Sequence, residues 1–308
     1  MKIGHFLLLT AAAASFGAFA AEPTPNLPPT EVVARVLRAN PTVQAASGQV
    51  RVEEANRSRL EAGPYEWNLR FGANQRRVYP AAGNDERYNE WNAQLERPLR
   101  LPGKSLADAE LGSLGVAIAE TGQGDALHEA SRMLLKTWFV WLKENAAANQ
   151  WNAQFTLLER QTKAVQRRQQ LGDAARLEAV QAEGALAQAE AQLAQVRARQ
   201  TTASEDLRRR FPGLPLSEPA SIAEPPAIAG SESEWLEAIL EHSHELGIAR
   251  GETQRAQVIA GRAGNDRLPD PTVGVHIARE RSNEEHILGA YITIPLPGGA
   301  RRAVASAT

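Results

Sequence analysis

AQLERPLRLPGKSLADAE (residues 93–110) and YITIPLPGGARRAVASAT (residues 291–308) are two versions of one pattern. In each, an alternation of apolar and polar residues ends in a turn rich in proline and glycine, with basic residues beside it. After the first turn, from Lys104 to about Gln170, the sequence has no proline and little turn chemistry. This predicts one very long helix, in which Gly122 and Gly124 are the weak points.

The residues that precede each turn repeat as well. Residues 30–62 predict a helix that starts at a Thr cap, ends before Gly63-Pro64 and is divided near Asn40-Pro41. Residues 66–98 predict a β-hairpin, since apolar and polar residues alternate in both of its arms. Residues 234–264 and 271–297 predict a second helix and a second hairpin. Aligning Pro98 with Pro295 gives the same order of elements in both halves, which indicates an internal duplication.

The duplication predicts the domain organisation. A first repeat covers residues 22–210, a proline-rich connector covers 211–232, and a second, incomplete repeat covers 233–308. The first repeat ends in a return helix from Ala174 to Arg210, with Gly172 just past the end of the long helix and Asp173 as cap of the next. At a rise of about 1.5 Å per residue, the long helix spans about 100 Å, and the return helix and the helix of residues 234–264 span about 55 Å and 45 Å.

The return helix carries two rows of apolar or small residues on nearly opposite sides. One row steps by three and four residues, as in a coiled coil; it comprises Ala179, Ala182, Leu186, Ala189, Leu193, Val196, Gln200, Ala203 and Leu207. The second row comprises Leu177, Val180, Gly184, Ala187, Ala191, Ala194 and Ala198. Two rows indicate a helix packed on both sides, as in a curved wall of helices. An amphipathic helix in a small bundle is the alternative.

The N-terminus and the composition indicate an exported protein. Residues 1–21 have Lys2, an apolar run and small residues at Ala18 and Ala20, the plan of a secretory signal peptide. An N-terminal membrane anchor is the alternative, but the run is far shorter than the roughly 20 residues a spanning helix needs. The formal charge is −2, which argues against nucleic-acid partners, and the absence of cysteine excludes disulfides and thiolate chemistry.

The four alternating strands are the only segments that suit a membrane. A strand of about 10 to 12 residues crosses an outer membrane when it is tilted, but four strands cannot close into a barrel. Since lipid does not tolerate open sheet edges, we expect several chains to share one barrel. The fold class expected is therefore mainly α, with long antiparallel coiled-coil helices and four membrane strands. The residues expected to face the water-filled pore are Asn68, Arg70, Asn74, Asn92, Gln94, Thr272 and His276.

The order of elements and the duplication resemble those of TolC-type outer-membrane efflux proteins over essentially the whole mature chain. The turns RPLRLPGK and IPLPGGARR resemble those of the CzcC-like, heavy-metal branch. The resemblance implies a homotrimer whose twelve strands form one outer-membrane barrel above a periplasmic helical tunnel. It also implies a periplasmic adaptor protein, an inner-membrane pump that is proton-driven, and passive exit of substrates, with heavy-metal cations as one possibility.

The resemblance also implies a role for the turn between the long helix and the return helix, and it implies that residues are missing at the C-terminus. It implies that the turn engages the adaptor, through Leu171, Gly172, Asp173, Ala174, Ala175 and Leu177. Ordinary helix-turn-helix chemistry would also select Gly-Asp there. Subunits of the family continue beyond the fourth strand into another long helical hairpin, so we expect the chain to be C-terminally truncated by on the order of 100 residues.

Other chemistry in the sequence is weak. PGKS at residues 102–105 lacks the leading glycine of a phosphate loop. His242 and His244 lie two apart in a predicted helix, and His276 and His286 lack a third ligand. We therefore predict no enzymatic activity, cofactor or metal site. A soluble periplasmic coiled-coil adaptor and a non-functional channel fragment remain as alternative functions, and the strands distinguish a channel from an adaptor, which needs no strands with apolar faces.

Overall fold

The computed structural model describes residues 27–218, 224, 227, 229–296, 298, 299, 301 and 303. The predicted signal peptide at residues 1–21 lies outside them, as do residues 219–223, 225, 226 and 228 of the connector and most of residues 297–308. The chain forms two compact units, residues 1–36 with 139–228 and residues 37–138 with 229–308. A single long helix, residues 102–170, contributes to both units, since the boundary between residues 138 and 139 falls within it.

Helix α3 comprises Pro102–Gln170, 69 residues without interruption, where the sequence predicts one helix from Lys104. Neither Gly122 nor Gly124 breaks it. Gly124 has a packing role instead, because a Cβ atom there would lie 2.8 Å from Nε2 of His244. The glycine therefore permits close contact with helix α6, His244–Asn265.

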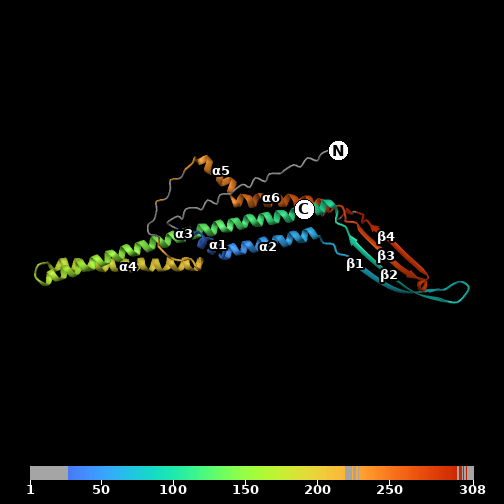
Figure 1. Ribbon diagram of the computed structural model, residues 1–308, viewed down its shortest axis with the longest axis horizontal. Coiled ribbons are helices and arrows are strands. Elements are labelled where there is room, and N and C mark those ends of the chain that lie inside the picture. Colours follow the sequence, from blue (N-terminus) through green and yellow to red (C-terminus); the bar gives the residue numbers. More distant parts are fainter. Residues whose placement is uncertain are drawn as a thin grey trace, which may run out of the picture. The chain divides into compact units, whose positions relative to one another are not determined.

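In the first unit, α4 (Arg176–Arg210) runs antiparallel to the second half of α3 (Figure 1). The buried residues of α4 all belong to the first predicted row, and they are Ala179, Ala189, Leu193, Val196 and Leu207. Trp141, Leu142 and Ala148 of α3 are also buried. Arg199 of α4 forms an ion pair of 3.0 Å with Glu144 of α3. Every residue of the second predicted row is exposed in the single chain, so its packing in an assembly stays a prediction.

Each half of the chain has a broken helix before its hairpin. The first comprises α1 (Thr30–Arg38) and α2 (Pro41–Ala62), with Asn40 as N-cap at the predicted division. The second was predicted as one helix, and this was wrong. It comprises α5 (Glu232–His242) and α6, and the Ser243 hydroxyl caps α6 by accepting from the N–H of Leu246. Counting from the two caps aligns TEVVARVLRAN with SEWLEAILEHS residue for residue, so the break is part of the repeated pattern.

The second unit contains one antiparallel sheet in the order β1-β2-β3-β4 (Figure 1). Its strands are Asn68–Val78, Glu86–Pro98, Thr272–Glu280 and Glu285–Thr293. β1 with β2 and β3 with β4 are the two predicted hairpins, and β2 joins them by pairing with β3. A mainly helical fold with a four-stranded antiparallel sheet confirms the predicted fold class. After β4, Gly299, Arg301 and Ala303 have helical conformation.

Candidate functional site

The strand register separates the side chains of the sheet into two faces. Residues that pair directly across antiparallel strands project to the same side. Arg70 pairs with Gln94, Gln94 with His276, and His276 with Gly289, and this defines one face at all four strands. All seven residues predicted to face water lie on that side, which we call the polar face: Asn68, Arg70, Asn74, Asn92, Gln94, Thr272 and His276.

The opposite side, the apolar face, is exposed to solvent in the single chain. Leu69, Phe71 and Leu288 are 69%, 71% and 82% exposed. Phe71 stacks on Trp91 with ring centroids 6.0 Å apart. The rest of the face continues this surface with Leu95, Val275, Ile277 and Ile292, each at least 37% exposed. A contiguous apolar surface of this kind marks an interface with a membrane or another protein.

The polar face carries carboxylates that the sequence analysis did not select. The hydroxyl of Tyr291 on β4 donates to Glu96 on β2 across 2.7 Å, reaching over β3. This is possible because the intervening residue is Gly274, where a Cβ atom would lie only 2.5 Å from the Tyr291 ring. The ring of His276 lies 6.2 Å from that of Tyr291. The alternation placed Glu96 on the polar side already, so the same signal could have identified it.

Nearer the hairpin loops, Arg76 organises the polar face. Its guanidinium lies 3.1 Å from Glu90 and 2.9 Å from Glu280, so it bridges the two predicted hairpins. Tyr88 donates a hydrogen bond to Glu86. Over the whole polar face, the charged residues are five glutamates, at 86, 90, 96, 280 and 285, and two arginines, at 70 and 76. The face is therefore net acidic.

A group of charges, all but one of them largely buried, lies where the strands meet the helices, and we call it the base cluster. The side chains of Lys104 and Asp270 are 3% and 7% exposed and form an ion pair of 3.1 Å. Asp108 lies 2.9 Å from Arg100 and 2.7 Å from Arg262. The cluster contains three cations and three anions in mutual contact and is completed by one phenol; its members are Tyr65, Arg100, Lys104, Asp108, Arg262, Asp266 and Asp270.

The base cluster joins segments from both halves of the sequence. Arg100 donates to the carbonyls of Leu60 and Glu61 at the end of α2, and Asp270 accepts from the N–H of Leu101. Hydrogen bonding to Asp270, with burial and the charge of that carboxylate, raises the pKa of Tyr65 to about 12. Burial alone would raise the pKa of Asp270, but hydrogen bonds from Tyr65 and Leu101 and the charge of Lys104 hold it below its ordinary value.

The predicted docking residues form a compact turn between α3 and α4, the tip turn. Gly172 has φ +83°. The N–H groups of Gly172 and Asp173 donate to the carbonyls of Gln169 and Arg168, the two bonds of a Schellman motif. The prediction that Asp173 caps the next helix was wrong, because the N-cap is Ala175 and has no side-chain cap. Asp173 instead pairs with Arg168 at 3.4 Å. Leu171 and Leu177 are 75% and 66% exposed.

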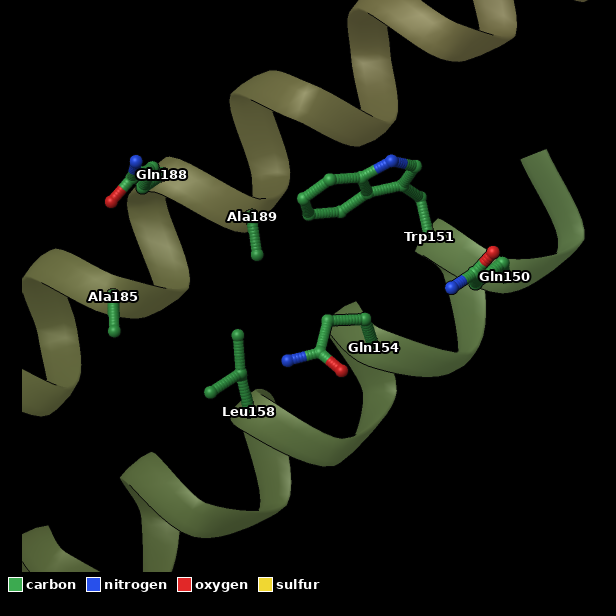
Figure 2. A pocket seen from close by; sticks show the side chains of 7 residues that line it. All are labelled: Gln150, Trp151, Gln154, Leu158, Ala185, Gln188 and Ala189. Carbon is green, nitrogen blue, oxygen red and sulfur yellow. The ribbon is translucent and has the colours of Figure 1, made fainter. Parts of the chain in front are cut away.

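A groove of about 430 Å³ lies on the α3–α4 hairpin (Figure 2). The indole of Trp151 and the side chain of Leu158 extend from α3 toward α4, where Ala185 and Ala189 leave space between the helices. Gln150, Gln154 and Gln188 supply polar groups at its margins. The small residues of α4 therefore leave the hairpin with a partly apolar depression.

The described residues contain neither a group of metal ligands nor a helix that could span a membrane. Among the described residues, no three His, Cys, Asp or Glu side chains are grouped so that they could hold a metal ion. In the same part of the chain, no helix has both the length and the apolarity required to cross a membrane. His128 and His244 have ring centroids 6.1 Å apart, a contact within the helical packing of the second unit.

Comparison with solved structures establishes the fold. The chain matches CusC, whose crystal structures concern transmembrane channel formation, with a TM-score of 0.68, 15% identity, and coverage of 90% of this chain and 68% of CusC. The chain also matches the outer membrane protein VceC of Vibrio cholerae, with a TM-score of 0.62, 17% identity, and coverage of 90% of this chain and 71% of VceC. It matches the outer membrane channel CmeC of Campylobacter jejuni with a TM-score of 0.62, 13% identity, and coverage of 90% of this chain and 63% of CmeC. The chain thus spans roughly two thirds of these proteins. No family model matches the sequence, and no curated protein matches it.

Proposed function

We propose that the chain is a subunit of a trimeric outer-membrane efflux channel of the TolC type, a passive exit duct in a tripartite system. The observation that carries this proposal is the sheet with one polar face and one exposed apolar face, built on long helices. The fold of CusC, VceC and CmeC supports it, because these are outer membrane or transmembrane channel proteins. A soluble adaptor would gain nothing from exposing Leu69, Phe71 and Leu288.

The open edges of the sheet favour a shared barrel. Among the strands of the described residues, β1 and β4 each pair with one neighbour, so each has an edge that lipid would leave unsatisfied. Four strands are about half the number in the smallest membrane barrels. Three copies would supply twelve strands, with the polar faces turned inward and the apolar faces turned toward outer-membrane lipid.

The periplasmic parts of the proposal rest on the helices. The tip turn exposes Leu171 and Leu177 on a backbone fixed by Gly172, which suits contact with an adaptor protein. The adaptor would link the channel to a proton-driven inner-membrane pump. Residues 1–21 would direct export before removal.

The charge of the polar face favours cationic substrates, including heavy-metal cations of the branch that the turns resemble. Five glutamates outnumber two arginines on that face in each chain, and a barrel of three chains would triple the excess. A narrow lumen lined by one sign of charge concentrates counter-ions. Electrophysiology of purified channels in planar bilayers should show a preference for cations, and Glu96→Gln should reduce it.

Cysteine labelling tests the proposed orientation of the sheet. Because the chain has no cysteine, a single cysteine reports on one position only. In outer-membrane fractions, His276→Cys on the polar face should react with a charged, membrane-impermeant thiol reagent many times faster than Val275→Cys on the apolar face. Leu177→Cys at the tip turn is the positive control from the periplasmic side.

Assembly is checked on the same preparations. Native mass spectrometry of detergent-solubilised protein should give three chains per particle. Recovery of the labelled variants as monomers in the soluble periplasmic fraction, with equal reaction rates at 275 and 276, would show that the channel proposal is wrong.

A further inference from the structure

The charges of the sheet are segregated between its faces. All five strand glutamates lie on the polar face, and within the strands, which are described in full, the apolar face carries no carboxylate. That face carries cations instead, and most lie toward the hairpin loops. We call Arg77, Arg87 and Arg279 the loop-end cations.

Two of the loop-end cations form a directly opposed pair of like charges, and the third lies opposite a histidine. Arg77 pairs with Arg87 across β1 and β2, and Arg279 pairs with His286 across β3 and β4. Like charges directly opposite each other destabilise a sheet, unless an anion lies between them. The side chains of the three loop-end cations and of His286 are exposed, and none of them has a hydrogen bond, ion pair or ring contact with another described residue. By contrast Arg97, at the other end of the face, lies over the Trp67 ring.

The position of these cations matches a membrane boundary. Moving along the strands toward the loops, the apolar residues end at Trp91, which is level with Arg279. Arg87 lies four residues further along β2, about 13 Å at the rise of a strand. The cations therefore occupy a zone that begins at the last row of apolar residues and extends about 13 Å beyond it, where lipid headgroups would lie if the apolar band contacts hydrocarbon.

We propose that the loop-end cations bind phosphorylated lipid headgroups of the leaflet on the hairpin-loop side. The inference rests on the proposed membrane insertion of the sheet. Arginine suits this partner because its planar guanidinium donates in pairs to phosphate oxygens and stays charged. A phosphate placed between opposed arginines would replace their repulsion by two attractions. Basic residues next to an apolar membrane segment attract anionic headgroups in the same way.

The test compares lipid binding by the 308-residue chain and by a variant in which two of the three loop-end cations are removed. The parent, the double variant Arg77→Gln/Arg279→Gln and the matched control Arg70→Gln on the polar face are reconstituted in phosphatidylcholine with diphosphoryl lipid A. Lipid A retained on the protein is measured by native mass spectrometry. The double variant should bind lipid A roughly 25-fold more weakly than the parent, about fivefold per arginine, and Arg70→Gln should bind like the parent.

Folding is controlled in the same experiment. Removing Arg77 relieves its repulsion with Arg87, and removing Arg279 takes away a charge that has no partner among the described residues, so the double variant should insert into pure phosphatidylcholine at least as well as the parent. Equal retention of lipid A by parent and double variant would overturn the inference, as would an equal loss in Arg70→Gln. A parent that inserts into phosphatidylcholine but shows no preference for lipid A would overturn this inference alone. Failure to enter either membrane would contradict the proposed function and the inference together.

Discussion

The two ends of α3 are held in opposite ways. At its first residues, the base cluster fixes the helix through buried side chains, with Lys104 3% exposed between two carboxylates. At its last residues, the tip turn is held by backbone hydrogen bonds around Gly172, and its side chains remain exposed. The base is therefore held by side chains, whereas the tip is held by its backbone and leaves its side chains exposed, and contact of the tip with a partner stays a proposal.

The largest effect should come from Asp108 in the base cluster. Asp108→Ala leaves Arg100 and Arg262 without their shared carboxylate. Breaking a buried ion pair by removing one partner costs about 3–5 kcal/mol, because the remaining charge stays buried. We expect the free energy of unfolding to fall by that amount, measured by denaturant titration with circular dichroism in detergent. The control is Asp206→Ala, which removes an exposed ion pair with Arg210. An equal loss of the free energy of unfolding in both variants would show that the ion pairs of the base cluster contribute no more than an exposed pair.

Tyr65 should have the next largest effect. Tyr65→Phe removes the hydrogen bond to Asp270, and a bond to a charged group contributes about 1.5–3 kcal/mol. The pKa of Tyr65 is raised to about 12 in the folded protein, so the folded state keeps its proton longer than the unfolded state, whose pKa is about 10. The stabilisation is therefore present below about pH 10 and is lost as the pH rises toward 12.

The pH dependence gives the measurement for Tyr65. Between pH 9 and pH 12, the parent should lose more of its free energy of unfolding than Tyr65→Phe, when both are followed by denaturant titration. Parallel curves for the two proteins would contradict the role of this hydrogen bond. Tyr79→Phe, in the loop after β1 and 68% exposed, is the matched control and should follow the parent.

At the tip, the backbone should matter more than the side chains. Gly172→Ala places a Cβ atom at φ +83°, where an L-residue costs roughly 1–2 kcal/mol. We expect the amides of the tip turn to exchange with deuterium faster, by the factor that this free-energy cost corresponds to. The exchange rates of amides near the base cluster should stay unchanged. Gly184→Ala on the exposed side of α4, which has open space for the methyl group, should slow exchange or leave it unaltered. If Gly172→Ala loosened the base as well, the two ends of α3 would not be independent.

The same comparison shows what the sequence could and could not predict. Local patterns determine the turn at Gly172, the two hairpins and the uninterrupted α3, and the alternation of the strands placed the seven polar residues on one face. The base cluster was missed because its members lie far apart in sequence, as Tyr65 and Asp270 do. The break at Ser243 was missed because a serine inside a helical pattern caps a new helix only when the backbone turns there.

The smallest effect should come from Asp173. Its substitution distinguishes the capping role predicted from the sequence from the ion pair with Arg168 seen in the structure. If Asp173 capped α4, then Asp173→Ala would cost about 1 kcal/mol. The structure shows only a pair with Arg168 at 3.4 Å, in which the two side chains are 52% and 77% exposed, and such pairs contribute little. We expect the free energy of unfolding and the deuterium exchange of the first turn of α4 to stay unchanged in Asp173→Ala, while exchange increases in Gly172→Ala. A loss of protection at Arg176 to Ala179 in Asp173→Ala would restore the capping role, and would mean that side chains as well as the backbone hold the tip.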